Sequence, residues 1–226
     1  RRTLGDGIGE SLRNMGISKK ETRNRVEKLL LICGLTPEYA DRYPHQVSGG
    51  ECQRAAIARA LAVEPRVLIC DEATSALDVT VQAQVLEQLN QLRKDFGTAL
   101  IIITHNLGIV ARYADTVKIM YGGKIVEDGP TDEVFENPQH PYTLGLIRAV
   151  PRLDLPRSHG LYTIEGEPPD MSKIPPDCCA FHSRCKYADE LCRSCRPQPE
   201  QVGERHWCAC FHRELAQAER EEVLSI

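Results

Sequence analysis

Two adjacent carboxylates, Asp71 and Glu72, are the first residues in the sequence whose types and positions suit chemistry. They follow a short apolar run over residues 66–70, which predicts a buried parallel strand with both acids at its carboxyl end. One carboxylate can hold a hard cation such as Mg²⁺ while its neighbour polarises a water molecule. Taken alone, the dipeptide favours a structural role, in which an acidic strand end caps the next helix.

A glycine-rich turn is the second candidate, formed by Ser48, Gly49, Gly50 and Glu51 directly before a strong helical pattern. Glycines let backbone N–H groups approach phosphate oxygens closely, and the dipole of the following helix adds positive potential. The alternative is a turn that only caps the helix.

A lone imidazole, His105, follows a second apolar run over residues 99–103. A third strand is predicted at 116–120, and helices are predicted at 79–95 and 107–113. This alternation of strand and helix predicts an α/β fold with a parallel sheet, whose functional groups lie at the carboxyl ends of buried strands. A single histidine is otherwise more often a satisfied core residue.

Helical patterning also fills residues 6–33, before the glycine-rich turn. Ser18 is placed to cap the second helix of this segment with Glu21 as its capping-box partner. Gly34 is placed to end that helix.

Seven of the ten cysteines lie between residues 178 and 210. Disulfide frameworks belong to small oxidised domains, whereas a local cluster beside an α/β body more often binds a metal. We therefore expect a reducing compartment. Converging thiolates bind either an iron–sulfur cluster or a structural zinc ion, and the spacing is not the pair-and-pair pattern of a zinc ribbon. Plain thiols are the remaining alternative.

Composition sets broader limits on the chain. With 226 residues, 42% hydrophobic and 27% charged, it can form one large domain and a small one, and a change to proline-rich texture predicts a boundary near residue 150. The net charge of −4 excludes nucleic acid as the default partner. The longest apolar stretch, residues 99–104, is too short to span a bilayer, so we expect a soluble chain. The start lacks both Met and a signal peptide, which indicates a fragment.

The order of these motifs resembles the ATPase domain of ATP-binding-cassette transporters over residues 1 to about 150. That order is Ser48 to Glu51, then Asp71 and Glu72, then Ser75, Ala76, Leu77 and Asp78, then His105. The resemblance implies a partial P-loop NTPase sheet with a helical signature subdomain over about 5–63. The sequence departs mildly from the family, with Val47 and Glu51 around the signature turn and Asn106 after the histidine.

The same resemblance assigns roles to individual residues. Asp71 would hold Mg²⁺ through its water shell, Glu72 would be the general base, and His105 would contact the γ-phosphate of ATP. Ser48, Gly49, Gly50, Glu51 and Asp78 would bind nucleotide at the seam of a head-to-tail pair of ATPase subunits.

The phosphate-binding loop G-x-x-x-x-G-K-[ST] is absent from the 226 residues. In the family it precedes the region matched here, as do the base-stacking aromatic residue and the Q-loop. We therefore predict that this chain alone neither binds ATP tightly nor hydrolyses it.

A second resemblance concerns residues 151–226 and the segment before them. Residues 140–151 and 164–169 look like the C-terminal extension of dipeptide, oligopeptide and nickel importer ATPases, although Pro141 could simply begin a helix. Cys179, Cys185, Cys192 and Cys210 match the family's four-cysteine pattern. The resemblance implies a loop-rich metal-binding extension with a [4Fe–4S] cluster, or zinc as the alternative, and leaves Cys178, Cys195 and Cys208 surplus.

The implied protein is the ATP-hydrolysing subunit of an importer of di- or oligopeptides, peripheral at the cytoplasmic face of the inner membrane. Its implied partners are a second ATPase subunit, identical or not, membrane permease subunits and, indirectly, an extracytoplasmic solute-binding protein. Two alternatives stay open. One is a soluble ATPase of the same superfamily without a permease, and the other is a non-catalytic metal-binding regulatory fragment.

Overall fold

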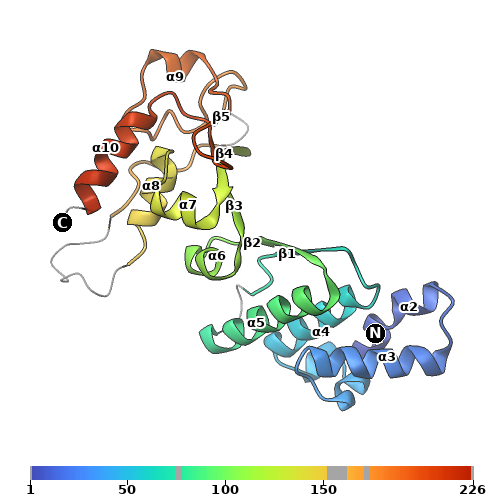
Figure 1. The fold of residues 1–226 in the computed structure, drawn as a ribbon. Coiled ribbons are helices and arrows are strands. Elements are labelled where there is room, and N and C mark those ends of the chain that lie inside the picture. The colour runs from blue at the N-terminus through green and yellow to red at the C-terminus, as the bar shows by residue number, and fades with distance from the viewer. Residues whose placement is uncertain (1, 75–77, 152–161, 171–173, 225–226) are drawn as a thin grey trace. The chain divides into compact units, whose positions relative to one another are not determined.

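The computed structural model describes residues 2–74, 78–151, 162–170 and 174–224 (Figure 1). These residues group into two compact units, Arg1–His105 and Asn106–Ile226. The predicted D-loop residues Ser75, Ala76 and Leu77 lie outside the described residues. The domain boundary that the sequence predicts near residue 150 stays a prediction.

The first unit is helical up to its first strand. Its elements are α1 (Leu4–Ile8), α2 (Glu10–Asn14), α3 (Lys19–Ile32), the 3₁₀ turns η1 (Pro37–Asp41) and η2 (Pro44–Gln46), α4 (Gly49–Leu61), β1 (Val67–Asp71), α5 (Val79–Phe96) and β2 (Ala99–Ile103). The predicted ends of α3 are confirmed. The side chain of Ser18 accepts a hydrogen bond from the Glu21 N–H, and Gly34 follows the helix with φ of +71°.

The core of this unit lies between α3, α4, α5 and one face of the β1–β2 pair. On α3 the buried residues Val26 and Leu30 are four apart, so they share one helix face. They belong to the same cluster as Ala58 of α4, Leu89 of α5 and Leu68 of β1. The helices therefore bury one continuous apolar stripe each.

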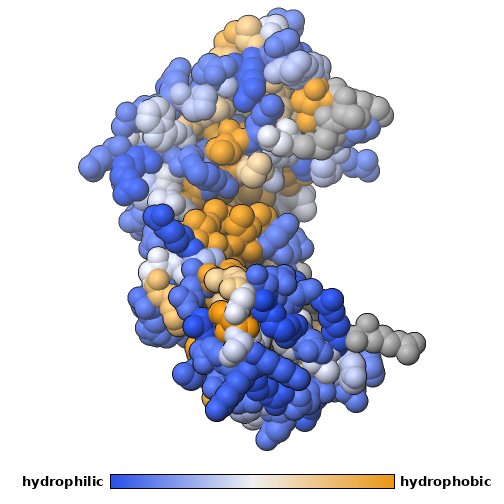
Figure 2. Space-filling view, turned by 90° about the vertical axis from the view of Figure 1, so that its right-hand side faces the viewer, coloured by the Kyte–Doolittle hydropathy of each residue, from blue (hydrophilic) through white to orange (hydrophobic). Residues whose placement is uncertain are grey.

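The strands β1 and β2 pair in parallel, with Val67 opposite Ala99 and Asp71 opposite Ile103. The prediction that both strands are buried holds for only one face of the pair in the described chain. Leu68 and Cys70 are buried, but Ile69 is 61% exposed and Ile101 is 48% exposed. Side chains alternate between the two faces of a sheet, and the helices of this unit cover only one of them. Figure 2 shows groups of apolar side chains, in orange, on the face of the molecule turned toward the viewer.

The second unit contains an antiparallel sheet of four strands in the order β3-β4-β6-β5. Its elements are α6 (Leu107–Tyr113), β3 (Thr116–Tyr121), β4 (Lys124–Pro130), α7 (Thr131–Glu136), α8 (Pro141–Arg148), α9 (Glu190–Ser194), β5 (Glu200–Gln201), β6 (Trp207–Cys208) and α10 (Arg213–Leu224).

The strand predicted at 116–120 does not join the parallel sheet, and this prediction is corrected. Gly122 and Gly123 both have positive φ, +56° and +71°, which is the geometry of a two-residue hairpin turn. The turn reverses the chain, so β3 pairs with β4 in antiparallel fashion.

The cysteine-rich segment packs on this sheet. Phe181 is 3% exposed and lies against Tyr121 of β3 and Tyr142 of α8, with ring centroids 5.0 and 5.3 Å apart. Cys179 and Cys185 lie against the same apolar cluster. The segment after residue 174 is therefore held by the aromatic core of the unit.

Candidate functional site

Glu72 and His105 lie together at the carboxyl end of the parallel strand pair. The Nδ1 atom of His105 is 3.0 Å from Oε1 of Glu72. The register explains this contact, because Asp71 pairs with Ile103 and the Glu72 N–H donates to the Ile103 carbonyl at 2.9 Å. Glu72 follows β1 directly, and His105 comes two residues after β2, at the same sheet edge.

The backbone of Glu72 has φ of +44°, which is uncommon for a residue with a side chain. Such conformations are costly and concentrate at functional sites. The turn aims the carboxylate of Glu72 at the imidazole. Both side chains are exposed, by 53% and 76%, so solvent and a ligand can reach them.

Asp71 ends β1 beside this pair and is also exposed. The site therefore presents two adjacent carboxylates and one imidazole at one sheet edge. Oxygen ligands of this kind suit Mg²⁺, and a carboxylate bonded to an imidazole suits proton transfer.

Ser48, Gly49 and Gly50 begin helix α4, as the sequence predicts. Ser48 caps the helix, since its side chain accepts from the Glu51 N–H, while Oε2 of Glu51 accepts from the Ser48 N–H at 2.7 Å. Glu51 also accepts from the Tyr39 hydroxyl, and this hydrogen bond, together with those from Ser48, lowers the pKa of Glu51 to about 2. These hydrogen bonds fix the turn at an exposed helix N-terminus, a position that favours anions.

Asp78 caps the next long helix, α5. Its Oδ1 atom accepts from the N–H groups of Thr80 and Val81 at 3.1 and 3.0 Å. The capping role was not part of the sequence prediction for this residue.

The structure brings the four predicted cysteine ligands near one another. Burial, together with the neighbouring side chains of Cys185 and Cys192, raises the pKa of Cys179 to about 11 and that of Cys210 to about 12. These thiols are therefore protonated at neutral pH, and a bound metal has to displace their protons. In addition, the Cys179 N–H donates to the Cys192 carbonyl at 2.9 Å.

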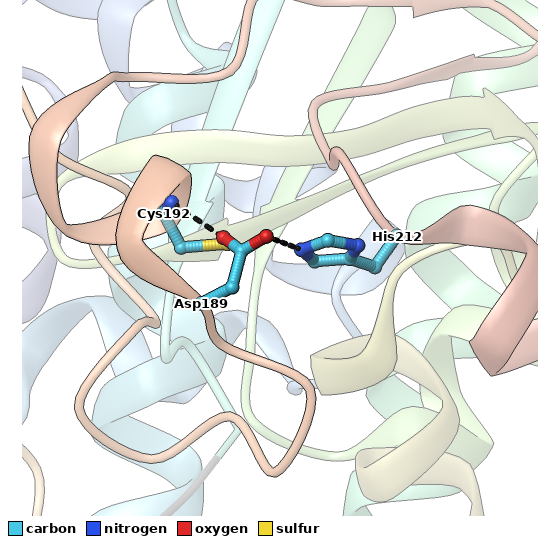
Figure 3. A group of neighbouring side chains, drawn as sticks. All are labelled: Asp189, Cys192 and His212. Carbon is cyan, nitrogen blue, oxygen red and sulfur yellow. Dashed lines mark hydrogen bonds and ion pairs between the residues drawn. The ribbon is translucent and has the colours of Figure 1, made fainter.

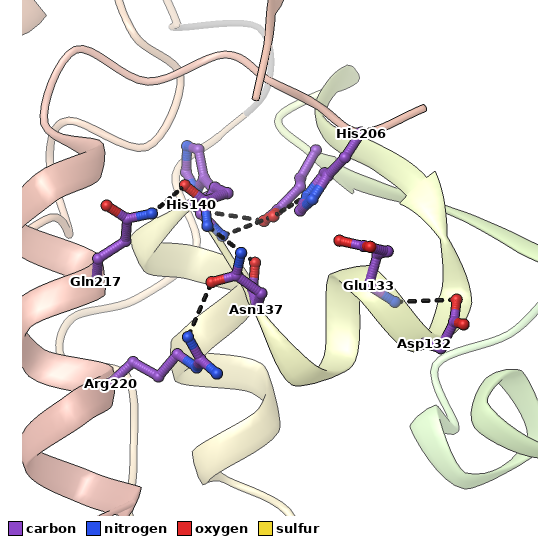
Figure 4. Close-up of polar contacts among 9 residues, drawn as sticks. Asp132, Glu133, Asn137, His140, His206, Gln217 and Arg220 are labelled. Carbon is purple, nitrogen blue, oxygen red and sulfur yellow. Dashed lines mark hydrogen bonds and ion pairs between the residues drawn. The ribbon is translucent and has the colours of Figure 1, made fainter. Parts of the chain in front are cut away.

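Sequence reasoning missed a buried polar network in the second unit (Figure 4). Glu127 of β4 is 1% exposed and accepts from His206 Nε2 at 2.8 Å and from the N–H groups of Gln139 and His140 at 2.7 and 3.0 Å. Three donors satisfy the carboxylate, so its burial is tolerated. The only signal in the sequence is an acid inside the strand-like run at 124–130. This signal does not indicate which residues donate to the acid.

Two family models match the chain. The model described as "ABC transporter" matches residues 6–75, and the model described as "Oligopeptide/dipeptide transporter, C-terminal region" matches residues 126–192.

Curated relatives are similar over almost the whole chain. A di/tripeptide transport ATP-binding protein of Pseudomonas aeruginosa is 45% identical over 215 residues, which are 95% of this chain and 66% of the relative. An oligopeptide transport ATP-binding protein of Salmonella typhimurium is also 45% identical, over 93% of this chain and 64% of the relative. The chain thus spans slightly less than two thirds of the length of these relatives.

Solved structures agree on the fold. A protein of Clostridium perfringens described as part of an ABC transporter complex has a TM-score of 0.55 at 32% identity, covering 64% of this chain and 57% of its own. A dimeric ATP-binding cassette bound to ADP and Pi in a post-hydrolysis state has a TM-score of 0.53 at 26% identity, covering 57% of each chain.

The mixed parallel and antiparallel sheets and the helices before them define the fold of an ATP-binding cassette. The chain belongs to the family of ATP-binding-cassette transporter proteins, and it carries the C-terminal region of the oligopeptide and dipeptide transporters.

Proposed function

We propose that the chain supplies the hydrolytic half of the nucleotide site in the ATPase subunit of a peptide importer. The observation that carries the proposal is the contact between Glu72 and His105, 3.0 Å apart at the end of two paired strands. A general base must lie within hydrogen-bond reach of its water, and this pair offers one such position at an exposed edge.

Each acid and the imidazole has a distinct role in this proposal. Glu72 takes the proton from the water that attacks the γ-phosphate, and His105 orients the Glu72 carboxylate and contacts the phosphate. Asp71 would hold Mg²⁺ through the water shell of the ion, and the ion would neutralise charge on the phosphate oxygens. The unusual backbone of Glu72 supports the assignment, because strain of this kind is stored where a side chain must point in one direction.

The turn formed by Ser48, Gly49 and Gly50 contacts the nucleotide of a second ATPase subunit in this proposal. Its support is the capping geometry, in which Glu51 anchors Ser48 and leaves an exposed helix N-terminus. Asp78, the cap of α5, lies at the same seam between the two subunits. One of the similar solved cassettes is a dimer, which supports a paired arrangement.

The partners and substrate follow from the relatives. They are named as di/tripeptide and oligopeptide transport ATP-binding proteins, so we assign this chain to the import of short peptides with membrane permease subunits and an extracytoplasmic solute-binding protein. No helix in the described parts of the chain is long and apolar enough to cross a membrane. We place the subunit peripherally, at the cytoplasmic face of the inner membrane.

We further propose that Cys179, Cys185, Cys192 and Cys210 hold a [4Fe–4S] cluster. Four mutually interacting thiols suit either such a cluster or zinc. We favour the cluster over zinc because the same four cysteines match the four-cysteine pattern of the family's C-terminal extension.

The catalytic proposal is tested by fusing the N-terminal segment of a family member, with its P-loop, base-stacking aromatic residue and Q-loop, in front of residue 1. The fusion should hydrolyse ATP, whereas the 226-residue chain should not. In the fusion, Glu72→Gln should lower kcat by roughly 10²–10⁴-fold with little change in KM, because only proton transfer is lost. Glu87→Gln, at an exposed acid of α5, is the matched control and should have no effect. Wild-type turnover in Glu72→Gln would contradict the assignment of Glu72 as the general base.

The transport proposal has a separate test. The fused subunit should co-purify from solubilised membranes with permease proteins, and its ATPase rate should respond to them. A fully active subunit that never associates with a permease would instead support the soluble ATPase.

The cluster is tested by anaerobic reconstitution with iron and sulfide. Cys185→Ser should abolish the visible absorption of the cluster, while Cys195→Ser, at an exposed surplus cysteine, should retain it. Equal reconstitution of both variants would contradict this ligand set.

A further inference from the structure

A second group of metal-ligating side chains lies beside the four cysteines (Figure 3). Asp189, Cys192 and His212 bring one ligand atom each to within 4.8 Å of one another, and no other three acids, cysteines or histidines do so among the described residues. Only Cys192 is shared with the proposed cluster ligands.

The contacts within this group already orient its ligand atoms. Oδ1 of Asp189 accepts from the Cys192 N–H at 3.0 Å, which fixes the carboxylate at the start of α9. The other oxygen, Oδ2, lies 3.2 Å from Nε2 of His212. Figure 3 shows the carboxylate between the sulfur atom and the imidazole.

The imidazole is incompletely satisfied in this arrangement. Nε2 of His212 is buried and makes no well-aligned hydrogen bond within the described chain, although it lies within ion-pair distance of Asp189. A metal ion bound through Nε2 would give this buried atom a directed bond in addition to its contact with Asp189.

We propose that Asp189, Cys192 and His212 bind one divalent ion of the zinc class. One thiolate, one imidazole and one carboxylate form a set that zinc accepts and that the hard ions Mg²⁺ and Ca²⁺, which require oxygen ligands, do not. Tetrahedral zinc places its ligand atoms about 3.3–3.8 Å apart, so the group closes around an ion with roughly 1 Å of movement. Three protein ligands leave a fourth position for water, and the half-exposed Asp189 provides an entry path.

Because Cys192 is shared, zinc binding at this site affects the proposed iron–sulfur cluster. Zinc bound through Cys192 occupies one of the four thiols that the cluster requires. Zinc loading of the cluster-free protein therefore competes with cluster assembly. The zinc site does not depend on ATP hydrolysis, and it is tested in the cluster-free chain, so it can fail or succeed independently of the proposed function.

The test uses zinc and the cluster-free 226-residue chain. Titration against a chelator should give one zinc per chain, and X-ray absorption should show one sulfur with the remaining ligands nitrogen or oxygen. Asp189→Asn and His212→Gln should each weaken zinc affinity at least about tenfold. Cys179→Ser should leave it unchanged, because Cys179 belongs only to the four-thiol set.

Two further controls keep the result interpretable. Asp189→Asn keeps an oxygen that can accept from the Cys192 N–H, so α9 stays capped in this variant. It therefore remains a usable test if His212→Gln proves unstable. His182→Gln removes a nearby imidazole outside the group, whose Nδ1 lies 2.7 Å from the Cys179 carbonyl, and should not affect zinc. Four sulfur ligands, loss of zinc in Cys179→Ser, or no stoichiometric binding would each overturn the proposal.

Discussion

His140 is a fully buried imidazole that caps helix α8 through its ring. Its Nδ1 accepts from the Tyr142 N–H at 3.0 Å, so the ring is neutral and its proton is on Nε2. Burial lowers the pKa of His140 to about 3. Protonation of Nδ1 would remove the cap and leave a charge in an apolar core.

This residue predicts a pH dependence of stability. Unfolded His140 binds a proton near pH 6.5, whereas the folded residue does not until about pH 3. The unfolded state binds more protons across this window, so the free energy of unfolding should fall as pH drops below 6.5. Urea unfolding at pH 7.5 and 5.5 measures the effect while most carboxylates stay ionised.

The control for this prediction is His140→Asn, which keeps a capping acceptor and cannot titrate. It should be less stable than the wild type at pH 7.5 and should lose less stability at pH 5.5. An identical pH dependence in both proteins would exclude His140 as its source.

At the scale of single elements, Gly34 illustrates how one residue ends a helix. It follows α3 with φ of +71°, and a Cβ there would lie 2.7 Å from Nε2 of Gln88. Gly34→Ala should lower the free energy of unfolding by about 1–2 kcal/mol, because the left-handed backbone disfavours a side chain. The Gln88 side chain can move aside, so strain in the backbone dominates.

The matched control is Gly7→Ala inside α1, where φ is ordinary and a Cβ meets nothing within 4 Å. Alanine favours a helix over glycine, so this variant should be as stable as the wild type or slightly more so. Equal destabilisation by both changes in chemical unfolding would refute the backbone argument.

Elements were predictable from sequence where the signals were local. Ser18 and Gly34 mark the ends of α3, and the apolar runs at 66–70 and 99–103 are strands whose parallel pairing brings Glu72 to His105. What failed was the assignment of the strand at 116–120, although the two glycines of its hairpin are adjacent in the sequence. Alternation of strands with helices indicates a parallel sheet, but the two glycines of the turn decide the direction of this strand.

The remaining features depended on contacts distant in sequence. The carboxylate of Glu127 is satisfied by His206, 79 residues later, and Asp189 meets His212 across 23 residues. No period or short motif encodes such pairs, because they form only when separate elements pack. One-sided exposure of Ile69 and Ile101 was equally hidden, since an apolar run does not show which of its faces is covered.

At the scale of the whole molecule, each unit has its own buried cluster. Leu30 lies in the cluster of the first unit and Phe181 in that of the second. We predict two separable unfolding transitions. Leu30→Ala should destabilise the first unit by about 2–5 kcal/mol and Phe181→Ala the second by about 3–5 kcal/mol, each leaving the other transition in place.

Hydrogen exchange followed residue by residue distinguishes the transitions. Loss of protection in both units after either substitution would show that they unfold as one cooperative body. The single tryptophan, Trp207 of β6, reports the second unit by fluorescence.

The pairing of Glu127 and Asp128 with Cys208 and Trp207 spans about 80 residues of chain. At a synthesis rate of ~5–20 residues per second, β4 leaves the ribosome roughly 4–16 s before β6. During that interval the nascent sheet ends at β4, with its backbone groups unpaired. Newly made chains on neighbouring ribosomes of one messenger can join at such edges, so this interval is when the nascent chain is most exposed to pairing between chains.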